Sequence, residues 1–272
     1  MRIIFFGDTF GRPGREALKK IVPIWQEKYS PDAIIANVEN IAHGNGINEV
    51  TLGELRDMHT FTVFTSGDHI WDDGEAKSML QDPTWTLVRP ENFPPGSPGK
   101  GYRTAMAGSQ KLLVCNILGR SFIRAEVDSP FRAMDDILSR FTLKQDDDDK
   151  EHADAIFVDF HAETTSEKRA MGFYLDGRIS ALVGTHTHVP TADAQVLPAG
   201  TAYLTDAGMV GPFNSSIGLE PRSVIDRFLT QMPAKKEVVD NGRAEIGAAL
   251  IDVNRDGNAK SIQQLREIID YV

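Results

Sequence analysis

Five short apolar runs of this chain each end at residues that can bind a metal ion or move a proton. The runs, with the residues that follow them, are 3–6 before Asp8, 33–38 before Glu39 and Asn40, 61–67 before Asp68 and His69, 155–160 before His161, and 181–184 before His186 and His188. Their length and their β-branched and aromatic residues are typical of buried strands. Ligand sites of α/β sheets form beyond the carboxyl ends of strands. The five coincidences together predict one polynuclear metal site at the end of a sheet.

The chain has 272 residues, which is enough for one large domain or two small ones. Because the candidate ligands run from residue 8 to residue 188, we expect one domain over residues 1–272. A hydrophobic content of 41% with 25% charged residues is ordinary for a soluble globular protein. No apolar stretch approaches the roughly 20 residues of a membrane span, and Asp8 interrupts the first apolar run too early for a signal peptide.

A single cysteine, Cys115, excludes an internal disulfide framework and favours a reducing cytoplasm. It lies within the strand-like stretch 111–118, so we expect a buried small side chain rather than a nucleophile. The net charge of −10 and the lack of a basic stripe argue against long nucleic acid as the main partner. A small phosphorylated nucleotide remains compatible, no membrane partner is expected, and the sequence leaves a homo-oligomer open.

Apolar spacing and capping residues predict helices between the strands. They cover 14–29, 48–58 and 129–141, and two more begin at Thr164 or Thr165 and at Pro221. Residues 244–253 and 259–269 predict a hairpin. The stretches 89–101 and 208–220 are predicted as long loops, and the acidic run 146–149 as a solvated connection. Strands outnumber helices late in the chain, which favours a mixed sheet or two packed sheets.

The segment Thr185-His186-Thr187-His188 carries the strongest local metal-binding signal. Two histidines two residues apart in extended structure point to the same face, so both imidazoles can reach one ion, or each a neighbouring ion. His161 standing alone would be interpreted as a core histidine. His43 lies in a glycine-rich loop after Glu39 and Asn40, where close approach to a substrate is expected.

The candidate ligands combine nitrogen and oxygen without thiolate, which fits manganese, iron or zinc better than a soft metal. We expect two divalent or mixed-valence ions per chain, with iron or manganese favoured over zinc. Two ions about 3.5–4 Å apart can hold a bridging hydroxide and clamp the attacking and leaving oxygens of a phosphoester. The set of strand-end residues therefore indicates phosphoester hydrolysis.

With these residues assembled, the chain resembles the calcineurin-like metallophosphoesterases, and more specifically their bacterial YmdB-like branch. The segments that carry the resemblance are GDTFGRPGR, NVENIAHGNG, VRPENFPPGSPGKG, DFHAETTSEK, VGTHTHVPTAD and LTDAGMVGP, which span nearly the whole chain. The resemblance implies an α/β fold of the αββα sandwich type, with two mixed sheets. It also implies a dinuclear phosphodiesterase that hydrolyses nucleoside cyclic phosphates, 2′,3′-cyclic ones in preference to 3′,5′-cyclic ones, by attack of a metal-bridging hydroxide.

The resemblance also assigns roles by position. Asp8, Glu39, Asn40 and His188 would hold the first ion; Glu39 would bridge to a second ion, completed by Asp68, His161 and His186. His69 would donate a proton to the leaving group. The wider superfamily has a histidine at the position of Phe10, which the YmdB-like branch lacks. Asp68 stands where the superfamily usually has asparagine.

Two alternatives remain open, and Asp68 favours only the first. An additional negative charge tightens metal binding and reduces Lewis acidity, which would suit a nucleotide-sensing regulatory protein with a retained but slow site. A phosphomonoesterase, or a hydrolase of RNA ends, is the other alternative.

Overall fold

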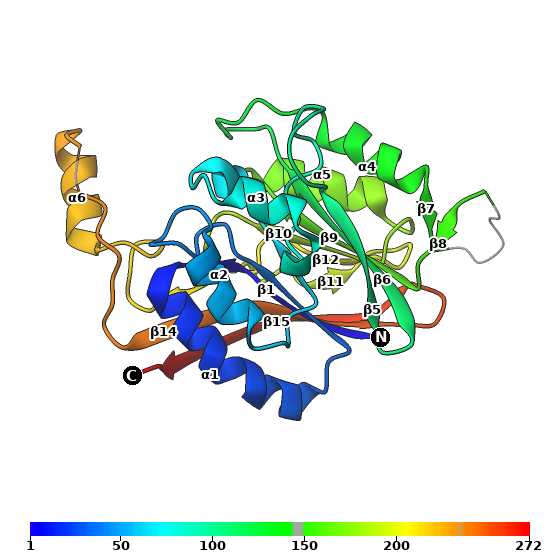
Figure 1. Ribbon diagram of the computed structural model, residues 1–272, viewed down its shortest axis with the longest axis horizontal. Coiled ribbons are helices and arrows are strands. Elements are labelled where there is room, and N and C mark those ends of the chain that lie inside the picture. Colours follow the sequence, from blue (N-terminus) through cyan, green and yellow to red (C-terminus); the bar gives the residue numbers. More distant parts are fainter. Residues whose placement is uncertain (144–148, 234) are drawn as a thin grey trace.

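The computed structural model describes residues 1–143, 149–233 and 235–272, and two β-sheets pack face to face at its centre (Figure 1). One sheet has the order β2 (Asp8–Thr9), β13 (Met209–Pro212), β14 (Arg243–Val253), β1 (Arg2–Phe6), β3 (Ala33–Asn37), β4 (Val63–Thr65), and β15 (Ala259–Asp270) also pairs with β14. The other has the order β11 (Gln195–Val196), β12 (Ala202–Leu204), β10 (Ala181–Thr185), β9 (Ala155–His161), β6 (Gln110–Leu118), β5 (Tyr102–Ala107). A small ladder joins β7 (Phe141–Thr142) to β8 (Glu151–His152).

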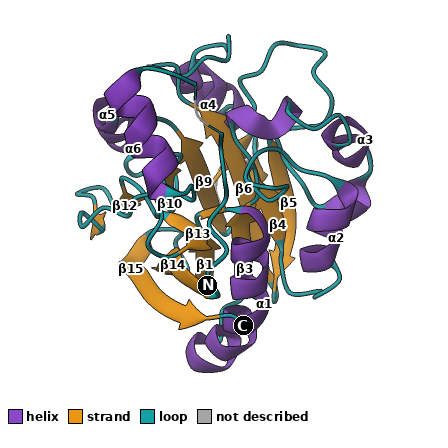
Figure 2. Cartoon of the chain, turned by 90° about the vertical axis from the view of Figure 1, so that its left-hand side faces the viewer, coloured by secondary structure: helices purple, strands orange, loops and turns teal. Residues whose placement is uncertain are grey.

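Helices cover the outer faces of both sheets (Figure 2). The helices are α1 (Gly11–Tyr29), α2 (Glu49–Arg56), α3 (Ala76–Gln81), α4 (Pro130–Leu138), α5 (Thr165–Leu175) and α6 (Pro221–Thr230), and short 3-10 turns are η1 (Asp68–Trp71) and η2 (Pro83–Trp85). The first three pack on the sheet that contains β1, while α4 and α5 pack on the sheet that contains β9. The predicted αββα sandwich with two mixed sheets is confirmed.

Successive side chains of a strand point to opposite faces of its sheet. Because both faces are covered here, the central strands carry apolar side chains on both faces. Ile4 and Phe6 of β1 face α1, whereas Ile3 and Phe5 face the second sheet. The rings of Phe5 and Phe157 lie 4.9 Å apart across the gap between the sheets. Both faces of each central strand are therefore buried, as expected of parallel strands covered on two sides.

The helix and hairpin predictions hold, with shifted ends. The first helix begins three residues earlier than expected and continues through Pro23, whose ring is exposed. Asn48 caps α2 by accepting a hydrogen bond from Thr51 N, and Ser129 caps α4, which ends three residues early. The predicted hairpin is formed by β14 and β15. Cys115 is fully buried, as expected.

The prediction of a loop over residues 208–220 is wrong in part, because Met209–Pro212 forms strand β13. Gly211 and Pro212 disfavour a strand, but pairing with β14 on one side and β2 on the other overrides that local preference. The short helix α3 was not predicted. Residues 146–148 of the acidic run lie outside the described residues. The described part of the chain contains no helix with the length and apolar content needed to cross a bilayer.

Helix α6 stands apart from the sheets (Figure 1). It buries no residue, and its apolar side chains Ile225, Phe228 and Leu229 are exposed. The segments on either side of it contribute Ile217, Leu219 and Val238 to the cleft described next.

Candidate metal centre

The carboxyl ends of parallel strands from both sheets meet at one edge of the sandwich. Strands β1, β3 and β4 run parallel in one sheet, and β9 and β10 run parallel in the other. Polar residues follow each strand: Asp8 begins β2 after β1, Glu39 and Asn40 follow β3, Asp68 and His69 begin η1 after β4, His161 ends β9, and His186 follows β10. The sequence-predicted residues are thus gathered at one place.

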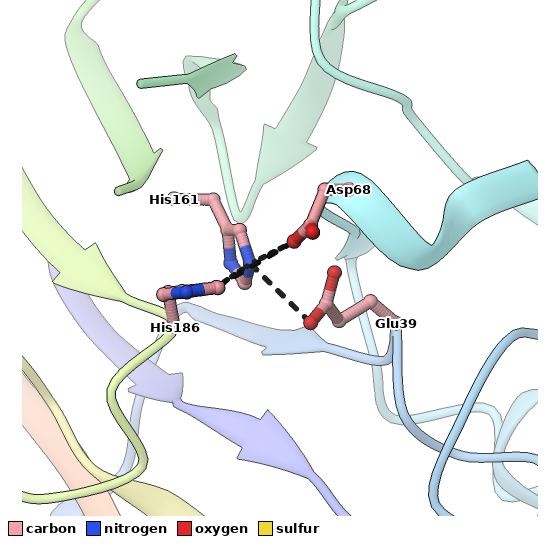
Figure 3. A group of neighbouring side chains, drawn as sticks. All are labelled: Glu39, Asp68, His161 and His186. Atoms are coloured by element: carbon pink, nitrogen blue, oxygen red, sulfur yellow. Dashed lines mark hydrogen bonds and ion pairs between the residues drawn. The ribbon is translucent and has the colours of Figure 1, made fainter. Parts of the chain in front are cut away.

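Four of these side chains converge on one point, as Figure 3 shows. Ligand atoms of Glu39, Asp68, His161 and His186 all lie within 4.8 Å of one another. His161 Nε2 lies 3.2 Å from Asp68 Oδ1 and 3.3 Å from Glu39 Oε1. His186 Nδ1 lies 3.0 Å from the same His161 nitrogen. This arrangement could hold one metal ion.

The remaining predicted ligands, Asp8, Asn40 and His188, adjoin this group. Asn40 Nδ2 donates to Glu39 Oε1 at 2.9 Å and lies 3.2 Å from His188 Nε2. Asp8 is fully buried, and its Oδ1 has no hydrogen-bond partner. A buried carboxylate oxygen without a hydrogen-bond partner is costly, so Asp8 Oδ1 is a candidate to contact a bound cation.

In each of the three histidines, one ring nitrogen contacts a neighbouring protein oxygen, and this contact orients the other ring nitrogen. His188 Nδ1 donates to Ile217 O at 3.1 Å, and His186 Nε2 lies 2.9 Å from Glu163 Oε2. His161 Nδ1 lies 2.9 Å from the hydroxyl of Thr185. In neutral histidines the opposite nitrogens, His161 Nε2, His186 Nδ1 and His188 Nε2, then carry lone pairs. Two of these nitrogens, His161 Nε2 and His186 Nδ1, lie 3.0 Å apart, so a proton or a bound cation can lie between them.

A buried carboxylate stands behind His161. Asp159 accepts hydrogen bonds from Thr185 Oγ1 at 2.7 Å, from Asn37 Nδ2 at 2.9 Å, and from the Thr65 hydroxyl. These partners lie on β10, β3 and β4, so Asp159 ties the two sheets together beneath the centre. Burial raises the pKa of Asp159 to about 7, although His161 and the two hydroxyls favour its charged form.

The carboxyl groups of the centre have shifted pKa values. Burial raises the pKa of Asp8 above its ordinary value. Burial would also raise the pKa of Glu39 and of Asp68, but the neighbouring histidines outweigh it and hold both below their ordinary values. Cations bound among these groups would favour all three carboxylates in the charged form. The donor set of carboxylate, amide and imidazole therefore fits hard or borderline metal ions.

A cleft of about 390 Å³ opens over the centre. Its lining includes Glu39, Asn40, His186 and His188, together with Phe10, His43, His69, Glu163 and Lys236. His43 was expected near a substrate and does line this cleft. His69 also lines it: its Nδ1 lies 2.7 Å from Asp72 Oδ2, and its main-chain N donates to Glu39 Oε2 at 3.1 Å.

One expectation about the histidine pair is wrong. His186 and His188 were expected to share a face of extended chain, but both follow the end of β10 with positive φ angles of 99° and 65°. In this left-handed conformation they reach different neighbours: His186 joins His161 and Asp68, and His188 joins Asn40. The alternative of two neighbouring ions fits this separation better than one shared ion.

Sequence reasoning missed several polar residues that support the centre. Glu163 contacts His186 and comes two residues after His161, a spacing that could have drawn attention to it. Asp159, inside an apolar strand, was also a detectable exception to the pattern of β9. Lys168 and Asp206, which form a buried ion pair, gave no local signal.

Comparison with known proteins identifies the family. The model of the YmdB-like protein family matches residues 4–265. The chain belongs to the YmdB-like family. A 2′,3′-cyclic-nucleotide 2′-phosphodiesterase of Bacillus subtilis (strain 168) is 41% identical over 270 residues, covering 99% of this chain and 97% of that YmdB-like relative. The resemblance inferred from the sequence motifs is confirmed.

Solved structures agree with this assignment. A hypothetical protein from Thermus thermophilus has a TM-score of 0.88 and 39% identity, covering 98% of this chain and 99% of its own. A novel phosphatase from Mycoplasma pneumoniae has a TM-score of 0.88 and 31% identity, covering 99% of this chain and 94% of its own. Both solved structures thus share the fold of this chain over at least 98% of its length.

Proposed function

We propose that the chain is a metal-dependent phosphodiesterase that hydrolyses nucleoside cyclic phosphates, with 2′,3′-cyclic phosphates as preferred substrates. The observation that carries the proposal is the convergence of Glu39, Asp68, His161 and His186, of which Glu39 and His186 line a cleft. The B. subtilis relative, at 41% identity, supports the reaction and the substrate class. It also favours a hydrolase over the nucleotide-sensing alternative suggested by Asp68.

The proposed centre holds two metal ions per chain. One ion would be held by Asp8, Asn40 and His188. The other ion would be held by Asp68, His161 and His186. The Glu39 carboxylate would contact both ions. Bound ions would activate water and offset negative charge on the phosphoryl oxygens. Iron or manganese is proposed ahead of zinc, because the site offers carboxylate, amide and imidazole without thiolate.

Residues of the cleft would orient the substrate and move protons. In the reaction, a water oxygen forms a bond to phosphorus while the bond from phosphorus to a ribose oxygen breaks. His69 would give its proton to the departing ribose oxygen. Asp72 Oδ2, 2.7 Å from His69 Nδ1, would hold the ring in place for this step.

The dimensions of the cleft favour a small substrate. About 390 Å³ suits a mononucleotide, and the net charge of −10 disfavours long nucleic acid. Lys236 at the cleft wall would supply positive charge next to a phosphate. With one buried cysteine, the protein is proposed to work in the cytoplasm.

The test is a substrate comparison on protein stripped of metal and then supplied with Mn²⁺, Fe²⁺ or Zn²⁺. The substrates are 2′,3′-cyclic AMP, 3′,5′-cyclic AMP, bis-p-nitrophenyl phosphate and the monoester p-nitrophenyl phosphate. We expect metal-dependent turnover of the diesters, with 2′,3′-cyclic AMP the best, and little turnover of the monoester. His59→Ala, at an exposed histidine outside the cleft lining, serves as the control for His186→Ala. Preference for the monoester would contradict the proposal.

A further inference from the structure

The two ligand histidines of residues 185–188 occupy an unfavourable backbone conformation. His186 and His188 have φ angles of 99° and 65°, in the left-handed region that non-glycine residues rarely adopt. Such a conformation persists only where surrounding contacts over-determine it. The contacts of this segment therefore show what places the two imidazoles.

Three side-chain contacts hold the main chain of the segment, in addition to a hydrogen bond from Ala162 N to Thr185 O at 3.4 Å. His186 N donates to Asp8 Oδ2 at 3.0 Å, within the centre itself. Thr187 N donates to Asp206 Oδ2 at 3.2 Å, and Thr185 O accepts from Lys168 Nζ at 2.8 Å. Two of the three contacts thus come from Lys168 and Asp206, which are outside the proposed ligand set.

Lys168 and Asp206 form a fully buried ion pair. Lys168 lies on α5, Asp206 follows β12, and Lys168 Nζ lies 2.7 Å from Asp206 Oδ2. Burying two charges is costly, and a well-packed apolar pair often stabilises a protein as well as or better than a buried ion pair. Stability alone therefore gives no reason for charged residues here, but the hydrogen bonds to the main chain on both sides of His186 do.

Gly184, directly before the segment, packs closely against Thr205 and the Lys168 side chain. A Cβ added at Gly184 would lie 1.9 Å from Thr205 O and 3.0 Å from Lys168 Cδ. The second oxygen of Asp206 accepts from Gly208 N at 2.8 Å, which anchors the carboxylate itself. Both members of the ion pair are thus held in place and hydrogen-bond to the main chain of the segment.

We propose that the Lys168–Asp206 ion pair is a positioning device that holds residues 185–188 in the conformation in which His186 and His188 have positive φ angles, and thereby sets the metal affinity of the centre. Both are positioning residues, because they act through the main chain of Thr185 and Thr187. This inference rests on the proposed metal centre.

The test uses paired substitutions that leave no buried charge without a partner. Lys168→Met together with Asp206→Asn removes both charges and the donor to Thr185 O. Lys168→Gln together with Asp206→Asn also removes both charges but keeps an N–H donor at position 168. The control pair is Arg2→Met with Asp252→Asn, an ion pair with an N–O distance of 2.7 Å at the start of β1, away from the centre.

Three quantities are measured: the dissociation constant for Mn²⁺ by chelator competition, the thermal midpoint of the metal-free protein, and hydrogen exchange of the Thr187 amide in the metal-free protein. We expect the Met/Asn pair to bind Mn²⁺ about 10- to 100-fold more weakly, the range typical of residues that orient metal ligands. Thr187 exchange should become at least about tenfold faster. The Gln/Asn pair should recover most of the affinity, and the control pair should keep both properties.

Each outcome decides something. If the parent binds Mn²⁺ and the Met/Asn pair binds it equally tightly, the inference is overturned while the proposed function stands. If the Met/Asn and Gln/Asn pairs lose affinity equally, hydrogen bonding at position 168 is not the cause and the inference fails. If neither pair folds, the ion pair is primarily structural and the inference is again overturned. A parent that binds no metal would overturn the proposed centre itself, together with this inference.

Discussion

The hydroxyl of Thr185 donates a 2.7 Å hydrogen bond to the buried carboxylate of Asp159. Because a hydroxyl has only one proton, the same oxygen acts as an acceptor towards His161 Nδ1, 2.9 Å away. The proton of the neutral His161 ring is thereby placed on Nδ1, and its Nε2 lone pair faces Glu39 and Asp68. One hydroxyl at the end of β10 determines which nitrogen of His161 is available to a metal.

Thr185→Val should therefore weaken metal binding. Valine keeps the shape but removes the hydroxyl that hydrogen-bonds to Asp159 Oδ1 and His161 Nδ1, so we expect about 10- to 100-fold lower Mn²⁺ affinity. The free energy of unfolding should also fall by about 1–3 kcal/mol. The measurements are chelator competition and denaturant unfolding.

Thr65→Val is the matched control for this prediction. The Thr65 hydroxyl also donates to Asp159, but it belongs to β4, in the opposite sheet from His161. This variant should lose a similar amount of stability and keep metal affinity closer to that of the parent. Equal losses of affinity in the two variants would show that the Thr185 contact does not orient His161.

His69→Ala should affect substrates according to how much their leaving group needs a proton. General acid catalysis is typically worth about 10²–10⁴-fold, so turnover of 2′,3′-cyclic AMP should fall by that order. Bis-p-nitrophenyl phosphate should lose much less, since nitrophenolate departs without a proton. Metal content, measured by elemental analysis, should stay near that of the parent. Equal losses on both substrates would instead assign His69 to phosphate binding or to orienting the attacking water.

Asp68→Asn should preserve the fold and keep activity equal to or above that of the parent. The two side chains are almost isosteric, and an amide oxygen can ligate without adding negative charge to a site already holding Asp8 and Glu39. Steady-state turnover and metal affinity should be measured together, with affinity expected to fall slightly. A loss of activity of about 100-fold or more, the upper end of what loss of an orienting group costs, would mean that the carboxylate is required.

The strand ends that carry the site were predictable because two physical patterns coincide there. Uninterrupted apolar runs indicate strands buried on both faces, and polar residues directly after them have few structural uses other than capping or binding. Asp8, Glu39, Asp68 and His161 could be found in this way. The assignment of separate ions, in contrast, came from family resemblance and not from spacing.

The conformation of the histidine pair could not be predicted. Local sequence indicated extended chain, but His186 and His188 have positive φ angles, and the main chain of residues 185–187 contacts Asp8, Lys168 and Asp206, which are distant in sequence. The same applies to β13, which exists because β14 and β2 pair with it. Long-range contacts decide such features, and a local pattern does not contain them.

The number of metal ions per chain tests the central claim most directly. Protein stripped with chelator and then equilibrated with saturating Mn²⁺ should bind two ions per chain by elemental analysis, because the predicted ligands form two groups joined by Glu39. His186→Ala should lower that number and nearly abolish turnover, while His59→Ala should change neither. Binding of at most one ion per chain by the parent protein would contradict the dinuclear account.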